Sequence, residues 1–421
     1  MASILVVGFN IRPLVFSLNQ AGYTVYAVDF FGDLDLFPYV EDVKIVTEEL
    51  DSQYLYLKQE YPRFLADFTL DMLKKHGHID YLLIGSGLDD AFEERLHIQN
   101  YVTENSYPIK SLNNEIDVLK KARDIFSIYK LLEKKGVPTP KTYRFKQNLI
   151  GKEIQYPFII KKKKSSGGIS VVKCENTQKF ELFLKIQQEK DIDLSEYLMQ
   201  EFIKGIAISC TVISNGENNQ IISVNRQILG EDLLNAPKKY IYCGNTVPAN
   251  LLRNDRKKVI QISKFLTSQL KLEGIIGFDY VLSNHEPYLM EINPRIPGSI
   301  RVSEEALNEN LLDLHVKSFG TENDWDFIQQ KLQNEAQKFV TKLILFAPQK
   351  IEPRMVKLIN KHPKVHDKSV PNKAILKGEP VCTILLAGKT FAGSYFNALK
   401  IAAHLNQLIE ESNKESSTVD Y

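Results

Sequence analysis

The chain has little cysteine and no long apolar run. Among its 421 residues only four are cysteines, and none forms a CxxC pair or a metal-ligand spacing: Cys174, Cys210, Cys243 and Cys382. This usage predicts reduced thiols in a cytoplasmic protein rather than a disulfide framework. No apolar run approaches the roughly 20 residues of a membrane helix, and the first residues lack a basic leader. We therefore expect neither a membrane span nor a signal peptide.

The chain also lacks an excess of charge of either sign. Lys and Arg together number 53 and Asp and Glu 52, for a formal net charge of +1. Such a balance gives no reason to expect nucleic acid or an anionic membrane as a partner. Hydrophobic residues make up 43% and charged residues 25%, which is typical of a globular protein. The length predicts about two to three domains.

The first part of the chain alternates short apolar runs with helical patterns. The expected strand-forming runs are Ile4–Asn10, Tyr23–Asp29, Val43–Val46 and Tyr81–Gly87. This alternation predicts a parallel sheet covered by helices on both faces, with possible ligand sites at Gly8–Arg12 and Gly85–Asp89, beyond two strand ends. The first strand is not followed by GxGxxG, so dinucleotide binding is weakly supported.

Later segments have a different organisation. A helix is expected over residues 114–135, ended by Gly136-Val137-Pro138-Thr139-Pro140. Residues 156–314 mix strands with longer helices. A third segment begins near Phe339, with strands at 342–346 and 381–386 and a helix over 395–411. The polar residues 412–421 are expected to fray.

Two strand-like runs carry the most informative side chains. Gly277–Leu282 and Leu289–Arg295 are joined by a turn, so they should lie antiparallel with Asp279 near Glu291. Asn293 follows Glu291 by two positions and shares its face, and Arg295 is the next residue on that side. Carboxylate and amide oxygens suit Mg²⁺ together with phosphate oxygens, and arginine suits phosphate. Taken alone, the pattern also fits an exposed hairpin with a surface ion pair.

A second pattern suits phosphate. The strand Phe158–Lys161 is followed by Lys162–Lys164 and then by Ser165-Ser166-Gly167-Gly168-Ile169-Ser170. Glycine and serine amides approach oxygen atoms closely, and the lysines neutralise them. A solvated basic hairpin is the plain alternative.

Taken in order, these motifs resemble the ATP-grasp superfamily of ligases, the relatives of biotin carboxylase, carbamoyl-phosphate synthase and D-alanine–D-alanine ligase. The resemblance covers most of the chain: a Rossmann-like first part, the Gly136–Pro140 segment, the Lys161 strand with its loop, Met199–Gly205, and Asp279 to Arg295. The subgroup that the chain resembles is that of the archaeal-type predicted ATP-dependent carboligases. The implied fold is α/β and α+β: a Rossmann-like preATP-grasp domain (1–113), an ATP-grasp domain (114–325), a small β-rich C-terminal α+β domain (326–411) and a flexible tail (412–421).

The resemblance also implies roles for individual residues. Lys161 matches the lysine at the nucleotide, and Arg295 matches the arginine near the transferring phosphate, so these two are the catalytic candidates. The implied metal ligands are Asp279, Glu291 and Asn293. The implied nucleotide-binding residues, besides Lys161, are Ser165, Ser166, Gly167, Gly168, Ile169 and Ser170 in the mobile loop and Glu201, Phe202 and Ile203 in the adenine hinge.

Two positions depart from the family pattern. The family's Asp-Lys pair is absent because Ile125 follows Asp124, so Arg123 or Lys121 would have to replace the phosphate lysine. After Gly205, where many members have an acidic residue for the ribose, this chain reads Ile206-Ala207-Ile208-Ser209. Glu201 or a backbone carbonyl would then hold the ribose.

Substrate-binding candidates follow from where the resemblance places the acceptor. Arg226 could hold a carboxylate or form a structural ion pair, and Asn245 lies in the same region. Gly298 and Ser299 could open a helix that binds an anion, with Arg301 cooperating, or could simply cap it.

The resemblance implies an ADP-forming ATP-grasp carboxylate–amine ligase that uses ATP and Mg²⁺ (or Mn²⁺). It would activate a small-molecule carboxylate as an acyl phosphate and join it to an amine or similar nucleophile. Two alternatives stay open: a bicarbonate-activating carboxylase and a catalytically inactive ATP-binding protein. Against the carboxylase, Ile296–Ser299 replaces the Gln-Val-Glu-His segment of biotin carboxylases. A homodimer is compatible with the resemblance.

Overall fold

The computed structural model describes residues 1–52, 57, 60–164 and 167–417, with residues 412–417 as backbone only. The N-terminal part is a sheet of parallel strands in the spatial order β3 (Asp42–Ile45), β2 (Thr24–Asp29), β1 (Ser3–Gly8), β4 (Tyr81–Ile84) and β5 (Lys110–Ser111). Every residue of β1 is buried because helices cover both faces of the sheet. These helices are α1 (Arg12–Gln20), α2 (Val46–Glu49), α4 (Tyr61–Lys75) and α5 (Phe92–Glu104).

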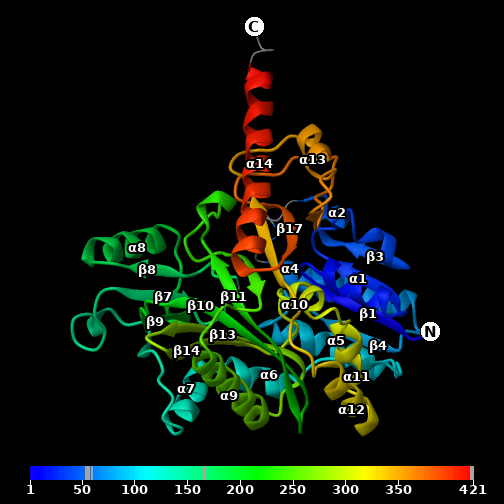
Figure 1. Cartoon of the computed structure of the whole chain (residues 1–421), viewed down its shortest axis with the longest axis horizontal. Coiled ribbons are helices and arrows are strands. Elements are labelled where there is room, and N and C mark those ends of the chain that lie inside the picture. The colour runs from blue at the N-terminus through cyan, green and yellow to red at the C-terminus, as the bar shows by residue number, and fades with distance from the viewer. Residues whose placement is uncertain (53–56, 58–59, 165–166, 418–421) are drawn as a thin grey trace.

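A large antiparallel sheet forms the centre of the molecule (Figure 1). Its strand order is β14 (Glu286–Asn293), β13 (Glu273–Ser283), β10 (Ile206–Asn215), β11 (Asn219–Leu229), β12 (Tyr242–Val247), β15 (Phe339–Phe346), β17 (Pro380–Gly388) and β16 (Val365–His366). The last three strands belong to the predicted C-terminal segment but continue the sheet of the middle segment. The predicted limits at 113/114 and 325/326 stay predictions.

A smaller sheet lies at the side of the central one (Figure 1), in the order β6 (Thr142–Arg144), β9 (Tyr197–Glu201), β7 (Phe158–Lys162) and β8 (Val172–Cys174). Helix α8 (Thr177–Glu189) covers it by burying Phe180 and Phe183 against Phe158. Burial of a phenylalanine side chain contributes about 2–3 kcal/mol. The remaining helices are α9 (Arg253–Leu270), α10 (Ile300–Leu307), α11 (Leu311–Ser318), α12 (Glu322–Lys331), α13 (Pro353–Ile359) and α14 (Phe391–Ser417).

The expected helix over residues 114–135 is wrong in one respect: it is two helices, α6 (Ile116–Arg123) and α7 (Ile125–Glu133). The break lies at Asp124, whose backbone leaves the helical region and whose carboxylate accepts a hydrogen bond from the Ser127 amide, 3.4 Å away. Aspartate favours this N-cap role because its side chain satisfies an amide that the helix leaves free. The break ends α6 at Arg123.

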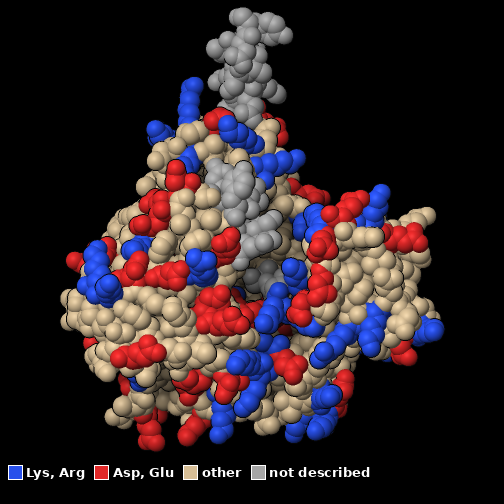
Figure 2. Space-filling model, turned by 180° about the vertical axis from the view of Figure 1, so that it is seen from behind, with Lys and Arg blue, Asp and Glu red and all other residues tan. Residues whose placement is uncertain are grey.

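Helix α14 runs to Ser417, beyond the expected end at 411, and it projects from the body of the molecule (Figure 1). The last four residues lie outside the described part of the chain. On the face drawn in Figure 2, basic and acidic side chains are intermixed, as the balanced composition predicts. Within the described residues, no helix combines the length and apolarity needed to cross a membrane.

One buried histidine gives a pH-dependent contribution to stability. The Nδ1 of His315 accepts a hydrogen bond from the Ile275 amide (3.0 Å), and its Nε2 lies 3.0 Å from the Leu112 carbonyl oxygen. Burial lowers the pKa of His315 to about 4, from about 6.5 in an unfolded chain. Protonation would place a hydrogen on Nδ1, opposite the Ile275 amide. The neutral ring therefore stabilises the fold fully above pH 6.5, and this contribution is lost as the pH falls through the folded pKa.

Lowering the pH from 7 to 4 should remove about 3 kcal/mol of unfolding free energy through His315, at about 1.4 kcal/mol per pH unit. Urea unfolding of the wild type and of His315→Gln across this range would measure it. The difference between the two should shrink as the pH falls. A constant difference would contradict the assignment.

Candidate active site

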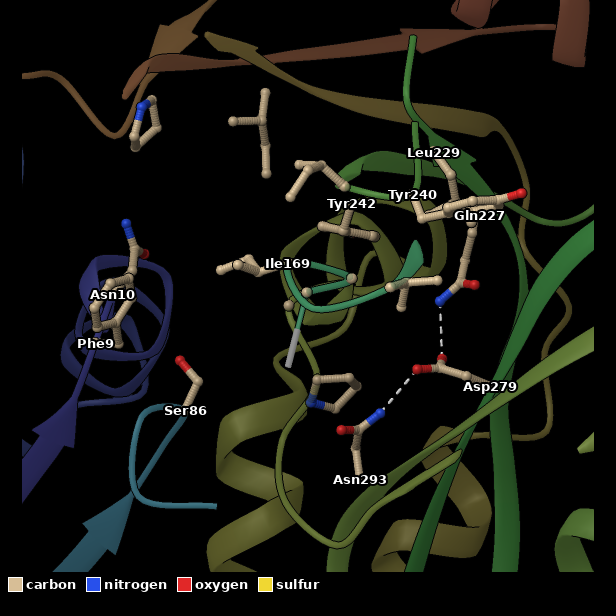
Figure 3. A pocket seen from close by; sticks show the side chains of 18 of the residues that line it. Phe9, Asn10, Ser86, Ile169, Gln227, Leu229, Tyr240, Tyr242, Asp279 and Asn293 are labelled. Atoms are coloured by element: carbon tan, nitrogen blue, oxygen red, sulfur yellow. Dashed lines mark hydrogen bonds between the residues drawn. The ribbon is translucent and has the colours of Figure 1, made fainter. Parts of the chain in front are cut away.

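A cavity of about 1050 Å³ lies between the N-terminal sheet, the small sheet and the central sheet. In Figure 3, Phe9, Asn10 and Ser86 approach it from the N-terminal sheet, while Gln227, Asp279 and Asn293 approach it from the central sheet. Asn10 and Ser86 belong to the two strand-end segments that the sequence marks as ligand positions. The open space is therefore bounded by segments far apart in the chain.

The predicted hairpin is confirmed as β13 and β14, with Asp279 directly opposite Glu291. Asp279 accepts hydrogen bonds from Gln227 Nε2 (2.8 Å) and Asn293 Nδ2 (2.9 Å), the two dashed lines in Figure 3. Burial and the nearby charge of Glu291 raise the pKa of Asp279 to about 7. Two facing carboxylates repel each other in this way, and a divalent cation bound by both would lower the pKa again.

Arg123 supplies positive charge beside Glu291. From the end of α6 its guanidinium forms an ion pair with Glu291 and two hydrogen bonds to Asp90, of 2.8 and 2.6 Å. The carboxylates keep the pKa of Arg123 above its ordinary value, against the effect of burial. Of the two proposed substitutes for the family lysine, Arg123 lines the cavity, whereas Lys121 is exposed and does not.

Lys161, near the end of β7, lies on the same side of the cavity. Its Nζ is 3.5 Å from the Met290 carbonyl oxygen on β14. Burial lowers the pKa of Lys161, and Glu291 opposes that shift. The hairpin and the small sheet therefore meet through this lysine.

The glycine-rich loop covers the cavity. The Gly167 carbonyl accepts a hydrogen bond from the Tyr242 amide (3.2 Å), and Lys238 Nζ donates to the Ile169 carbonyl (2.8 Å). Gly168 has φ +77°, and a Cβ there would overlap the Tyr240 carbonyl oxygen, so only glycine allows this approach. Ser165 and Ser166, also predicted for this loop, lie outside the described residues.

Most of the other predicted residues line this cavity too: Gly167, Gly168, Ile169, Ser170, Glu201, Phe202, Ile203, Gly298 and Ser299. Arg295 lines it as well and forms an ion pair with Asp89 from the N-terminal sheet. Ser299 is at the N-cap of α10 but its side chain makes no capping hydrogen bond.

Three predicted substrate residues are placed elsewhere. Arg226 does not line the cavity, because side chains alternate along β11 and Gln227 takes the cavity face. Asn245 is fully buried and accepts a hydrogen bond from the Tyr242 hydroxyl (2.7 Å). Arg301 lies over the Phe16 ring, 4.7 Å from its centre, and contacts Glu304 and Glu305 of its own helix.

The sequence interpretation missed Gln227, Tyr242 and Lys342, which also line the cavity. A signal for Gln227 was available: Asn225 and Gln227 are polar residues two apart on a strand, which indicates one polar face. Arg226, at the alternate position between them, does not line the cavity. Lys342 carried no local signal, because it reaches the site only through strand pairing from a distant segment.

A cavity with a glycine-rich cover, two facing carboxylates and adjacent cationic side chains has the components of a phosphoryl-transfer site. Residues 122–299 match the family model described as an ATP-grasp domain. This part of the chain is an ATP-grasp domain.

Individual proteins are similar to this chain in sequence or in structure. An uncharacterized protein of Methanocaldococcus jannaschii is 26% identical over 395 residues, covering 90% of this chain and 87% of that one. The tyramine–L-glutamate ligase of the same organism is 29% identical over 255 residues, covering 60% and 67%. The solved structure of an L-amino acid ligase from Bacillus licheniformis has a TM-score of 0.65 at 14% identity, covering 97% of each chain, which shows the fold alone.

These comparisons confirm the predicted fold class and the predicted enzyme class, an ADP-forming ATP-grasp carboxylate–amine ligase. Enzymes of the family use ATP and Mg²⁺. The donor set here fits Mg²⁺, which takes one or two carboxylates and completes its shell with phosphate and water oxygens. Among the described residues, no group of three or more His, Cys, Asp or Glu side chains is placed to hold a metal ion. Phosphate and water oxygens would therefore have to complete the coordination of Mg²⁺.

Proposed function

We propose that the protein activates a small-molecule carboxylate as an acyl phosphate with ATP and joins it to an amine or similar nucleophile. ADP and phosphate would be released. The observation that carries the proposal is the directly opposed pair Asp279 and Glu291 on the cavity wall, with Lys161 and Arg123 beside it. A purely structural hairpin gains nothing from facing carboxylates that raise a pKa.

The assigned roles follow from this placement. Asp279, Glu291 and the amide oxygen of Asn293 would hold Mg²⁺, which neutralises charge on the transferring phosphate. Lys161 and the loop residues 165–170 would hold the nucleotide phosphates, and Glu201–Ile203 its adenine. Arg295 would approach the γ-phosphoryl group after exchanging part of its ion pair with Asp89. Each assignment brings a cation or donor to an oxygen.

The chemistry proceeds in two balanced steps. A carboxylate oxygen of the substrate attacks the γ-phosphorus, and the bond to the β–γ bridging oxygen breaks, leaving ADP. The amine nitrogen then attacks the carbonyl carbon. The carbon–oxygen bond breaks with its electrons on phosphate, and the nitrogen loses a proton. In this proposal the side chains orient the reactants and neutralise charge.

The place and partners of the enzyme follow as further proposals. The four cysteines are free and buried, which supports a cytoplasmic location. Its partners would be a small-molecule carboxylate and an amine, rather than nucleic acid or a membrane. All of the assigned residues come from one chain, and the homodimer stays a prediction.

Arg123 and Lys121 form a matched pair on one helix that tests which replaces the family lysine. We expect Arg123→Met to raise the KM for ATP about tenfold or more, since a charged hydrogen bond contributes about 1.5–3 kcal/mol. Lys121→Met should leave it unchanged. Initial rates at varied ATP would measure both. An effect of Lys121→Met alone would contradict the assignment.

The test of the proposed function is product analysis. The purified protein is incubated with Mg-ATP and a small-molecule extract, and ADP is separated from AMP. ADP and phosphate that depend on the extract, and that disappear with Glu291→Ala, would support acyl-phosphate ligation. AMP and pyrophosphate would indicate adenylation and contradict the proposal. Dependence on bicarbonate alone would favour a carboxylase.

A further inference from the structure

The cavity is lined by two buried, oppositely charged side chains without assigned roles. Lys342 comes from β15 and is 7% exposed; Asp33 follows β2 and is 8% exposed. Both line the cavity. They therefore come from the central sheet and the N-terminal sheet, on two sides of one space.

Lys342 has no carboxylate partner among the described residues. Its recorded hydrogen bond is to the Gly298 carbonyl oxygen, 3.4 Å away. The acidic side chain that interacts most strongly with Lys342 is Asp367, but Asp367 is bound by Arg12 through bonds of 2.8 and 2.7 Å. Burial lowers the pKa of Lys342. A buried ammonium without a counter-ion is costly, so this one suits a ligand anion.

Asp33 carries the opposite charge and could be compensated by a cation. Its carboxylate accepts a hydrogen bond from Asn10 Nδ2 (3.0 Å), and no cationic side chain of the described chain forms an ion pair with it. Burial, and then the charges of Asp367, Asp29 and Asp35, hold the pKa of Asp33 well above its usual range, and the charge of Arg12 opposes this shift without cancelling it. A ligand cation would relieve this repulsion.

The two side chains do not satisfy each other. They interact electrostatically, but no ion pair forms between them. We propose that Lys342 and Asp33 form the acceptor subsite and bind a zwitterionic aminocarboxylate, such as an α-amino acid, with its carboxylate on Lys342 and its ammonium group on Asp33. This inference rests on the proposed function, whose amine substrate it specifies.

Other ligand classes fit the pair less well. A phosphate group would suit Lys342 but would meet Asp33 and Asp367. A simple amine would suit Asp33 and leave Lys342 without an anion. An uncharged molecule would leave both charges buried and unpaired, at a cost of several kcal/mol. Only a ligand that carries both signs compensates both side chains.

The test measures binding rather than turnover, so that it is independent of the ligase reaction. Standard L-amino acids, their D-forms, β-alanine and γ-aminobutyrate are each tested by thermal shift and calorimetry, with Mg²⁺ and a non-hydrolysable ATP analogue present. The best binder is then compared with its amide, which lacks the carboxylate, and with its deaminated acid, which lacks the ammonium group. Both analogues should bind the wild type at least about tenfold more weakly.

Two near-isosteric variants assign each charge to its residue. Lys342→Met should weaken binding of the amino acid and remove the preference for the amino acid over its amide. Asp33→Asn should weaken binding of the amino acid and remove the preference for the amino acid over the deaminated acid. Lys338→Met and Asp67→Asn, outside the cavity, serve as controls. Thermal melts confirm that each variant is folded.

Two outcomes would overturn the inference: no amino acid binds the wild type while the nucleotide does, or both variants keep the wild-type preferences. Failure of the proposed function is a separate result. If amino acids bind through Lys342 and Asp33 but no ADP forms with any of them, the subsite stands and the ligase proposal does not.

Discussion

Replacing Glu291 by alanine is expected to lower ATP turnover on the order of a thousandfold or more. The change removes the carboxylate opposite Asp279 and so one of two anionic ligands of the proposed Mg²⁺ site. It also removes one partner of Arg123, which keeps its bonds to Asp90. Coupled measurement of ADP release, at saturating and limiting Mg²⁺, would record the loss.

The fold should survive this change, because the Glu291 side chain is 33% exposed and makes little core contact. Glu286→Ala is the matched control. It lies on the same strand, forms an ion pair with Lys258 and does not line the cavity. Normal turnover in Glu291→Ala, or an equal loss in Glu286→Ala, would remove the metal assignment.

Replacing Lys161 by methionine is expected to weaken ATP binding about 10- to 100-fold. The charged contact to a phosphate oxygen contributes about 1.5–3 kcal/mol, and methionine keeps most of the volume of the side chain. Stability should be unchanged or slightly higher, since burial lowers the pKa of Lys161 and the fold loses a poorly solvated charge. Calorimetry with Mg-ATP would measure the affinity.

Lys179→Met, on the exposed face of α8, is the control for loss of one positive charge. If Lys161→Met binds ATP as the wild type does, Lys161 does not contact the nucleotide. If both variants lose affinity equally, a general effect of net charge would explain the result.

Much of the fold could be predicted from sequence because its signals are local. The strand Ser3–Gly8 is fully buried and its residues 4–7 are all apolar, as a central parallel strand requires. The turn between Gly277–Leu282 and Leu289–Arg295 makes the two strands antiparallel, which spacing predicts, but a register shift between Asp279 and Tyr280 places Glu291 directly opposite Asp279. The helix break at Asp124 was missed because the apolar periodicity continues across it. An aspartate that caps a helix and one that lies within it look alike in sequence.

The candidate site also has parts that local sequence signals predict and parts that they do not. The sequence by itself determined the hairpin that carries Asp279 and Glu291, the Lys161 strand and the glycine-rich loop, since each lies in one short segment. Only the tertiary structure decided that Arg123 meets Glu291, that Gln227 rather than Arg226 lines the cavity, and that Lys342 and Asp33 line the same cavity. These contacts depend on strand order and on how sheets from distant segments enclose one space, and spacing along the chain does not encode those distances.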